Sequence, residues 1–456
     1  MVAFLYRLGW RAARPLAAPL SRLGGKVGRA IRGRRASVPT FAAWAARARR
    51  PADPLVWFHA ASVGEGRQAE AVLTRVRAAR PGWQLAYSHS SPSAERLAAS
   101  LPADVAAYAP FDTVRDVTAA LDALQPTAIV FGATDVWPEL VRQADLRGVA
   151  LGLVSATLAR TSSRRGALAR RLLRPAYAAL DAVGAIDEAD ARELERLGVA
   201  RDRVTVTGDT RHDAALARLA AADGAAPHRR AIAPGADAAG APTILAGSTW
   251  PSDERVLLPA LADLRSRGTR FRLVIAPHEP TPKHLSALER RVRRHLGTDA
   301  SIARLSSLFP SRGSEPPATG TAASGNQVLL VDRVGILAEL YPAAAIAYVG
   351  GGFHGAGLHS VIEPAAAGVP VLCGPRHRSS RDARLLLTAG GAQEVRESRQ
   401  LAAALDGWLT NETARAAAGA AARAVVERGK GAADRSLHIV IDLVEHHPTP
   451  DPTPLG

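Results

Sequence analysis

The chain has 456 residues, enough for two or three domains, and 47% of them are hydrophobic, so large cores can be buried. Cys373 is the only cysteine, which excludes an internal disulfide and a cysteine-based zinc site and fits a reducing compartment. The formal net charge is +16, and residues 1–50 carry twelve arginines and lysines but no acid. Most of the excess positive charge therefore lies in an N-terminal arm.

The arm, residues 1–50, begins with apolar runs that are interrupted by Arg7, Arg11 and Arg14. These runs are too short to span a bilayer, and the continuous apolar core of a signal peptide is missing. In a helix, one face would carry the apolar side chains of Phe4, Leu5, Leu8 and Ala12. We therefore expect a basic amphipathic helix on the surface of an anionic membrane. The alternatives are a solvated arm and a nucleic-acid tail. Because the rest of the chain is only mildly basic, we expect no nucleic-acid partner.

After the arm, apolar strands alternate with helical patterns, as in a parallel sheet covered by helices. The predicted strands in this half are 54–61, 83–90, 127–133, 149–156, 181–187 and 204–209, and helices are predicted at 66–80 and 93–101. We assign residues 51–213 to an N-terminal Rossmann-like domain.

Residues 214–242 are rich in Ala, Gly and Pro and are predicted to link two domains. The alternating pattern then restarts, and we assign residues 243–445 to a second Rossmann-like domain. Residues 310–326 are predicted to be a flexible insertion, and residues 446–456 a disordered tail. Two such domains are expected to face a central cleft, because ligands of α/β folds bind at the carboxyl ends of the strands.

The stretch "GGGFHGAGLHSVIEP" (350–364) follows an apolar strand and places five glycines in eight positions. Glycines let backbone N–H groups come close to a ligand, and a helix start favours a phosphate. Glu363 is placed to bind ribose hydroxyls, as acids do in many nucleotide sites. The pattern predicts a nucleotide-sugar site, with a tight structural turn as the alternative. It matches neither GxGxxG nor the P-loop, which argues against a dinucleotide dehydrogenase and a P-loop NTPase.

Glu65 lies in "HAASVGEGRQAEAV" (59–72), where a strand ends and a helix begins. It is expected either to cap that helix or to act as a general base on an acceptor hydroxyl.

Three further stretches follow strands. In "VTGDTRHD" (206–213), Arg211 is a candidate partner of a donor phosphate, while His212 and Asp213 are assigned to a turn. In "LAGSTWPSDE" (245–254), Ser248 and Thr249 are candidate helix caps or phosphate contacts. In "IAPHEP" (275–280), His278 is either a ligand contact or a structural histidine.

Together these stretches resemble the 3-deoxy-D-manno-octulosonic acid (Kdo) transferases of lipopolysaccharide synthesis. The resemblance covers almost the whole chain. Its motifs here are "WFHAASVGEGRQA", "YAPFDT", "DVWPEL", "VTGDTRHD", "AGSTWPSDE", "APHEP" and "YVGGGFHGAGLHSVIEPAAAGVPVLCGP". It implies an α/β protein of the glycosyltransferase-B fold that moves Kdo from CMP-Kdo to a lipid A precursor. It also implies a peripheral protein at the cytoplasmic face of the inner membrane, with no metal and no cofactor.

The resemblance also implies roles for individual residues. Glu65 matches the proposed catalytic base, and Glu363 matches the ribose-binding acid. The phosphate-binding loop is matched by Gly351, Gly352 and the helix start at His359 and Ser360. Arg211 stands where the family usually has lysine, so the positive charge is kept. Ser248, Thr249 and His278 complete the expected donor site, and Ser62 and Asp135 are expected on the acceptor side.

The chain departs from the family pattern at several positions. In the stretch around "WP", Ala133 replaces the first glutamate of the family pattern, and the shorter Asp135 replaces the second. Glu139 replaces an asparagine. An "NAR" stretch is replaced by Ser155, Ala156 and Thr157; Ser360 replaces the asparagine of a His-Asn pair, and residues 277–279 read "PHE" where the family has "PRH". The first two groups of changes lie in the acceptor half. The alternatives are a related enzyme with another nucleotide sugar or acceptor, and a catalytically silent scaffold that binds membranes or nucleic acid.

Overall fold

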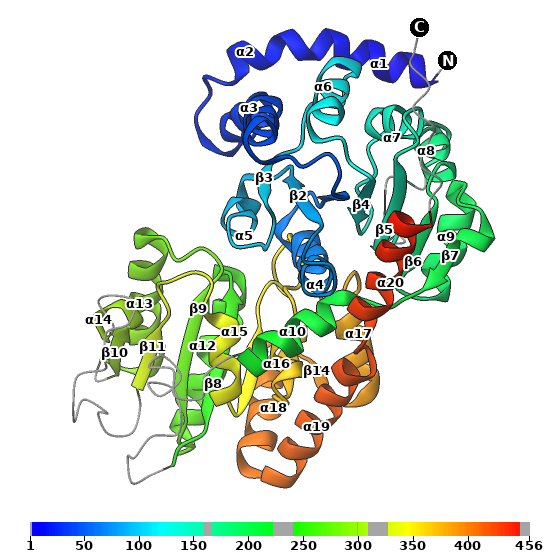
Figure 1. Ribbon diagram of the computed structural model, residues 1–456. Helices are drawn as coiled ribbons and strands as arrows, with labels where there is room; N and C mark the ends of the chain where they lie inside the picture. Colours follow the sequence, from blue (N-terminus) through cyan, green and yellow to red (C-terminus); the bar gives the residue numbers. More distant parts are fainter. Residues whose placement is uncertain are drawn as a thin grey trace, which may run out of the picture. The chain divides into compact units, whose positions relative to one another are not determined.

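The structure is a computed structural model that describes residues 2–158, 162, 164, 166–221, 240–298, 300–308 and 327–446. It divides into two compact units (Figure 1). The first unit combines Met1–Ala214 with Gly429–Gly456, and the second is Ala215–Arg428. The second domain predicted at 243–445 is therefore wrong at its C-terminal end. Most of the predicted linker, the insertion at 310–326 and nearly all of the tail lie outside the described residues.

The first unit is built on a seven-stranded parallel sheet with the strand order β3-β2-β1-β4-β5-β6-β7. The strands are β1 (Leu55–His59), β2 (Gln84–His89), β3 (Val105–Tyr108), β4 (Ala128–Gly132), β5 (Ala150–Ala156), β6 (Ala182–Ala185) and β7 (Val204–Val206). Every residue of β1, β2, β4 and β5 is buried, which explains the nearly continuous apolar runs of β1, β4 and β5. All six strands predicted for this half are confirmed, and β3 was missed.

The second unit repeats this design with the order β10-β11-β9-β8-β12-β13-β14. Its strands are β8 (Thr243–Thr249), β9 (Arg272–Pro277), β10 (Ser301–Arg304), β11 (Gln327–Leu330), β12 (Ile346–Val349), β13 (Val371–Cys373) and β14 (Ala392–Glu394). All pairs in both sheets are parallel, so the loops after the strands gather at one edge of each sheet.

Helices connect the strands of each unit. In the first unit they are α4 (Val63–Ala79), α5 (Glu95–Ala98), α6 (Val114–Leu124), α7 (Pro138–Asp145), α8 (Ala167–Ala178), α9 (Glu188–Leu197) and the C-terminal α20 (Ala432–Glu445). In the second unit they are α12 (Pro251–Ser266), α13 (Pro282–Leu296), α14 (Leu305–Leu308), α15 (Leu337–Leu340), α16 (Ile362–Ala366), α17 (Arg381–Ala389), α18 (Ser398–Thr410) and α19 (Glu412–Arg428). Helix α10 (Thr210–Ala221) carries the chain from the first unit into the second.

The N-terminal arm is part of the first unit rather than a separate segment. It forms α1 (Val2–Ala13), α2 (Ala17–Leu20) and the long α3 (Gly25–Ala48). The Tyr6 hydroxyl donates to Asp112 at 2.6 Å, and Phe41 of α3 is fully buried with its ring edge-on to Trp57 at 5.5 Å. The basic arm expected at residues 1–50 is therefore packed on the first unit. Among the described helices, none is both long enough and apolar enough to cross a bilayer.

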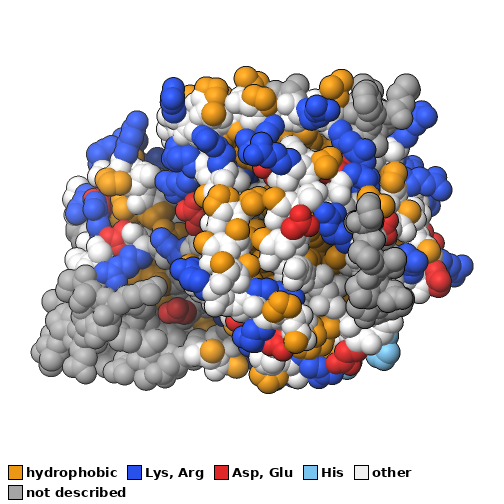
Figure 2. All heavy atoms as spheres, turned by 45° about the horizontal axis from the view of Figure 1, so that its top comes forward, with side chains coloured by type: hydrophobic (Ala, Val, Ile, Leu, Met, Phe, Trp, Pro, Cys, Tyr) orange, Lys and Arg blue, Asp and Glu red, His pale blue; other side chains and the backbone are white. Residues whose placement is uncertain are grey.

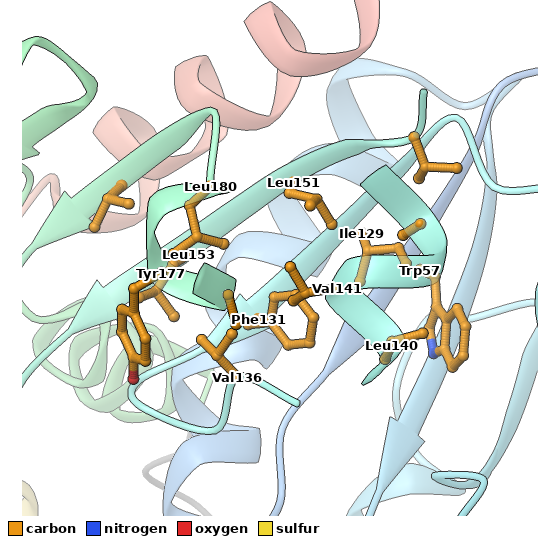
Figure 3. Close-up of a cluster of buried hydrophobic side chains, with 14 of the residues drawn as sticks. Trp57, Ile129, Phe131, Val136, Leu140, Val141, Leu151, Leu153, Tyr177 and Leu180 are labelled. Atoms are coloured by element: carbon orange, nitrogen blue, oxygen red, sulfur yellow. The ribbon is translucent and has the colours of Figure 1, made fainter. Parts of the chain in front are cut away.

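A buried apolar cluster above the first sheet supports the loop after β4. Figure 3 shows side chains of β1, β4 and β5 meeting those of α7 and α8. At the edge of this cluster, the hydroxyl of Tyr177 donates to the backbone carbonyl of Thr134 at 3.0 Å. The core thereby holds the loop that carries Asp135.

The C-terminal helix α20 packs on the first sheet, beside α4 and β5 (Figure 1). Leu443 lies so close to β5 that a Cβ atom on Gly152 would come within 2.5 Å of its Cδ1. The start of α20 is held by Asp213, whose two carboxylate oxygens accept the N–H groups of Gly431 at 2.7 Å and Ala433 at 2.9 Å.

We predict that Asp213→Ala lowers the free energy of unfolding by about 2 kcal/mol, because two backbone donors at the start of α20 lose their acceptor. Asp213→Asn keeps one acceptor oxygen and should cost less. Urea unfolding of the full chain measures both, with Asp434→Ala, an exposed aspartate on the same helix, as the control. Equal stability of the Asp213→Ala and control variants would contradict the role of Asp213.

Candidate active site

Glu65 lies in the first turn of α4, after β1, at the carboxyl edge of the first sheet. Its Oε2 atom accepts the backbone N–H and the hydroxyl of Ser62, both at 3.0 Å, and Ser62 Oγ accepts the Glu65 N–H at 3.4 Å. This reciprocal pair is a capping box. The predicted cap is therefore confirmed, while the general-base role stays a prediction.

The surroundings of Glu65 also suit a proton acceptor. Burial raises the pKa of its carboxyl, and the negative charge of Asp135 raises it further, against opposing effects of Ser62 and His59. A general base is most effective when its pKa lies closer to the working pH than that of an ordinary carboxylate.

Asp135 follows β4 and has three partners. Its Oδ1 accepts from Arg164 at 3.0 Å, and its Oδ2 accepts from the Trp137 indole at 3.1 Å and lies 3.4 Å from His59 Nε2. Burial alone would raise the pKa of Asp135, but the contacts with His59, Arg164 and Trp137 outweigh it and lower that pKa. Asp135 is therefore the permanent negative charge beside Glu65.

His59 is buried among the strands beside Asp135. The Trp137 indole Nε1 lies 2.9 Å from His59 Nε2 and 3.1 Å from Asp135 Oδ2, so its N–H is shared between these two atoms. On the other side of the ring, His59 Nδ1 is hydrogen-bonded to Ser88 Oγ at 2.8 Å. His59 thus connects the buried strands to the Asp135 loop.

Among the residues that the structure describes, three residues other than glycine have positive φ angles directly at the carboxyl ends of strands. They are Ala133 (φ 60°) after β4, Ser155 (φ 51°) in β5 and Ser248 (φ 56°) in β8. Such a conformation is costly for these residue types and is concentrated at functional sites. Ala133 and Ser155 are two of the positions where the chain departs from the family pattern.

Arg211 lies in the first turn of α10 and forms a close ion pair with buried Asp209, with its Nη2 2.5 Å from Oδ2. Burial would raise the pKa of Asp209, but Arg211 outweighs it and lowers that pKa to about 2. Thr210 joins the same network through Ser155 Oγ at 2.8 Å and the Gln68 carbonyl at 2.9 Å. Arg211 is thus held rigidly, and its contact with a donor phosphate stays a prediction.

In the second unit, the glycines at 350–352 are needed because other backbone segments pack directly against them. A Cβ atom added to Gly350 would lie 2.3 Å from the carbonyl oxygen of Ser248. A Cβ atom added to Gly352 would lie 2.4 Å from the backbone nitrogen of Gly374. Gly351 has φ 91°, and a Cβ there would lie 2.2 Å from the Gly357 carbonyl oxygen. These three positions require glycine because backbone segments meet there, whether or not a ligand also approaches.

Asp253 organises the same loop from α12. It is fully buried, and its Oδ2 accepts the N–H groups of Trp250 and Gly351, both at 2.9 Å. Its Oδ1 accepts from the Phe353 N–H and the Tyr348 hydroxyl, both at 3.2 Å. The Gly351 N–H, which was expected to face a phosphate, is therefore bonded inside the protein.

The helix after the glycine loop also differs from the prediction. Helix α16 begins at Ile362 rather than at His359–Ser360, and it has only five residues. Ser360 instead donates its hydroxyl to Glu363. Glu363 lies 3.8 Å from Arg218 and keeps a quarter of its side chain exposed. It remains the candidate for ribose binding.

The remaining predicted donor residues lie at the ends of β8 and β9. Trp250, not Ser248 or Thr249, is the N-cap residue of α12, so the capping prediction for these two is wrong. Thr249 is buried and donates to Glu254 at 3.3 Å. The exposed ring of His278 stacks on His359 at 4.3 Å and on Trp250 at 4.7 Å.

Sequence reasoning missed His59, Trp137 and Arg164 in the first unit, and Trp250 and Asp253 in the second. None of them carried a signal in the sequence: Asp253 lies four residues after Thr249 and five after Ser248, whereas a capping box requires an acid three residues after the cap. Within the described ranges, no three His, Cys, Asp or Glu side chains gather as metal ligands would.

Solved structures show the same fold. UDP-GlcNAc 2-epimerase from Neisseria meningitidis matches with a TM-score of 0.56 at 15% identity, over 86% of this chain and 99% of that one. MurG from Acinetobacter baumannii matches with a TM-score of 0.51 at 15% identity, over 85% and 99%. The expected glycosyltransferase-B fold is confirmed.

Sequence comparisons identify the family. A family model described as 3-deoxy-D-manno-octulosonic-acid transferase (kdotransferase) matches residues 34–214. The 3-deoxy-D-manno-octulosonic acid transferase of Bordetella pertussis is 30% identical over 87% of this chain and 89% of its own length. That of Chlamydia muridarum is 28% identical over 83% and 81%. The chain therefore belongs to the 3-deoxy-D-manno-octulosonic acid transferase family.

Proposed function

We propose that this protein transfers Kdo from CMP-Kdo to a lipid A precursor in lipopolysaccharide core biosynthesis. The observation that carries the proposal is a similarity to Kdo transferases that extends over both α/β units. The buried carboxylate of Glu65 beside Asp135 supports it, because a sugar transfer to a hydroxyl needs a base.

In the proposed reaction, Glu65 takes the proton of the acceptor hydroxyl while that oxygen attacks the anomeric carbon of Kdo. The bond from this carbon to the CMP phosphate oxygen breaks, and CMP leaves with the electron pair, so the configuration is inverted. Arg211 is proposed to stabilise the charge on the phosphate, and Glu363 to bind the ribose. Ser62 and Asp135 hold and tune Glu65 on the acceptor side.

We also propose that the N-terminal helices bind the anionic cytoplasmic face of the inner membrane. Large hydrophobic side chains are exposed here at Leu8, Leu16, Leu20, Leu23 and Val27. Exposed basic residues lie among them at Arg11, Arg22 and Lys26. In Figure 2, which brings the top of Figure 1 forward, basic and hydrophobic side chains are interspersed over this face. Such a surface fits anionic headgroups, and each basic residue contributes about 1 kcal/mol near them.

Replacing Glu65 by glutamine tests the base. Glutamine keeps the capping box but cannot take up the proton, so we expect Kdo transfer to fall by about 10²-fold or more with little change in Tm. Purified protein in detergent is incubated with CMP-Kdo and a tetraacylated lipid A precursor, and CMP release and lipid mass are followed. Full activity of the variant would refute the role of Glu65. Wild-type protein that binds CMP-Kdo but does not modify the lipid would point to another acceptor.

Asp135→Asn tests the electrostatics of the site through pH. The variant loses one of the charges that raise the pKa of Glu65, so this pKa falls. Because the base must be ionised to act, the acidic limb of kcat/KM should move to lower pH, whatever happens to the maximal rate. Asp434→Asn, which changes an exposed aspartate, should leave the limb in place. A limb that stays or moves to higher pH in Asp135→Asn would contradict this account.

The membrane proposal predicts that replacing both Leu20 and Leu23 by glutamate weakens binding to anionic vesicles by about tenfold or more, because apolar burial is lost and negative charge is added. Co-sedimentation with vesicles containing phosphatidylglycerol measures the effect. Leu385→Glu, an equally exposed leucine of the second unit, is the matched control. Equal binding by the two variants would contradict the assignment of this face.

A further inference from the structure

Four aromatic rings gather at the carboxyl edge of the second sheet. Trp250 stacks on His354 with ring centroids 3.9 Å apart and an interplanar angle of 6°. His278 stacks on both Trp250 and His359. The ring planes of Trp250 and His359 are nearly parallel, at an angle of 11°, and the indole Nε1 is 3.1 Å from His359 Nε2.

This arrangement fixes the proton on His359. An indole N–H can only donate, so His359 Nε2 must be an unprotonated acceptor, and the single proton of a neutral ring sits on Nδ1. Burial, together with the charges of His278 and His354, lowers the pKa of His359 to about 4, in agreement with a neutral ring.

The Nδ1–H of His359 points away from the protein atoms that hold the ring. Trp250 covers Nε2, and an added Cβ on Gly351 would lie 3.1 Å from Cδ2, so the Nε2–Cδ2 edge faces the glycine loop. Nδ1 lies opposite this edge in a five-membered ring. No described residue accepts a hydrogen bond from it, although the ring is half-buried.

Asp253 sets the positions of Trp250 and of the loop that leads to His359. One carboxylate oxygen accepts the N–H groups of Trp250 and Gly351, so the chain segment of the indole and the loop that leads to His359 are held to the same atom. The His359 N–H in turn donates to the Gly350 carbonyl at 3.1 Å. The donor at Nδ1 is therefore in place before any ligand binds, which reduces the cost of binding.

We propose that Trp250 is a positioning residue that holds His359 as a neutral Nδ1–H donor, so that the contact already expected between His359 and an oxyanion of the nucleotide-sugar donor is made through Nδ1. The inference rests on the proposed function, which assigns the nucleotide sugar to the second unit. Phosphate and sugar carboxylate share the required chemistry, and the binding experiment separates them.

The tautomer is tested without any ligand. In long-range ¹H–¹⁵N NMR spectra of histidine-labelled protein, His359 should show a protonated Nδ1 and an unprotonated Nε2, assigned by the signals missing in His359→Asn. Trp250→Phe keeps a stacking ring but removes the N–H, so the Nε2-protonated form should gain population. A wild-type His359 protonated on Nε2, or unchanged by Trp250→Phe, would overturn the inference.

Ligand binding is tested by calorimetry with cytidine, CMP and CMP-Kdo. We expect His359→Gln to bind CMP at least about tenfold more weakly with cytidine unchanged, since the lost bond is to a charged group. Trp250→Phe should weaken CMP binding in the same direction but less, because it only shifts the His359 tautomer. His359→Asn, whose amide N–H takes the place of Nδ1–H, should lose less than His359→Gln. A loss seen only with CMP-Kdo would assign the donor to the carboxylate instead. The control is Trp408→Phe, which changes a buried tryptophan of α18.

Two results would overturn the ligand role. Equal losses for all three ligands would mean that the rings only pack the loop, and no loss for any ligand would mean that His359 makes no such contact. If the wild-type protein transfers Kdo while the variants bind normally, this inference fails alone. If the wild type binds none of the three ligands, the proposed donor is wrong as well, while the NMR result still decides the tautomer.

Discussion

The second unit depends on a carboxylate that water does not reach. Asp253 accepts four hydrogen bonds, two of them from backbone groups of the glycine loop. A buried charge is tolerated only when its hydrogen bonds are satisfied, so the loop and the start of α12 must keep their present geometry. The glycine loop and the backbone of Trp250 are both held by this one group.

The first unit also contains a buried aspartate that accepts several hydrogen bonds. Buried Asp112 accepts the N–H groups of Glu139 and Leu140 at the start of α7 and the hydroxyl of Tyr6 from α1. Asp112 thereby connects α1 to α7, the helix that follows the loop carrying Asp135. Burial raises the pKa of Asp112 to about 6, a sign of how fully this group is removed from water.

Much of the fold was readable from the sequence because buried parallel strands leave uninterrupted apolar runs. The position of Glu65 after β1 was readable for the same reason. The partners of the site were not, since His59 and Trp137 are 78 residues apart, and Asp253 and Gly351 are 98 residues apart. The glycine run was ambiguous in principle, because glycine admits an approaching backbone as readily as a ligand.

The placement of α20 has a consequence for synthesis. The second unit is one continuous stretch, whereas the first needs both ends of the chain. Val440 and Leu443 of α20 are buried in the cores of the first unit. On the ribosome, domains generally fold from the N-terminus onward. Here we expect the second unit to fold before the first one is complete. The first unit completes its core last, because α20 is synthesised after the whole second unit.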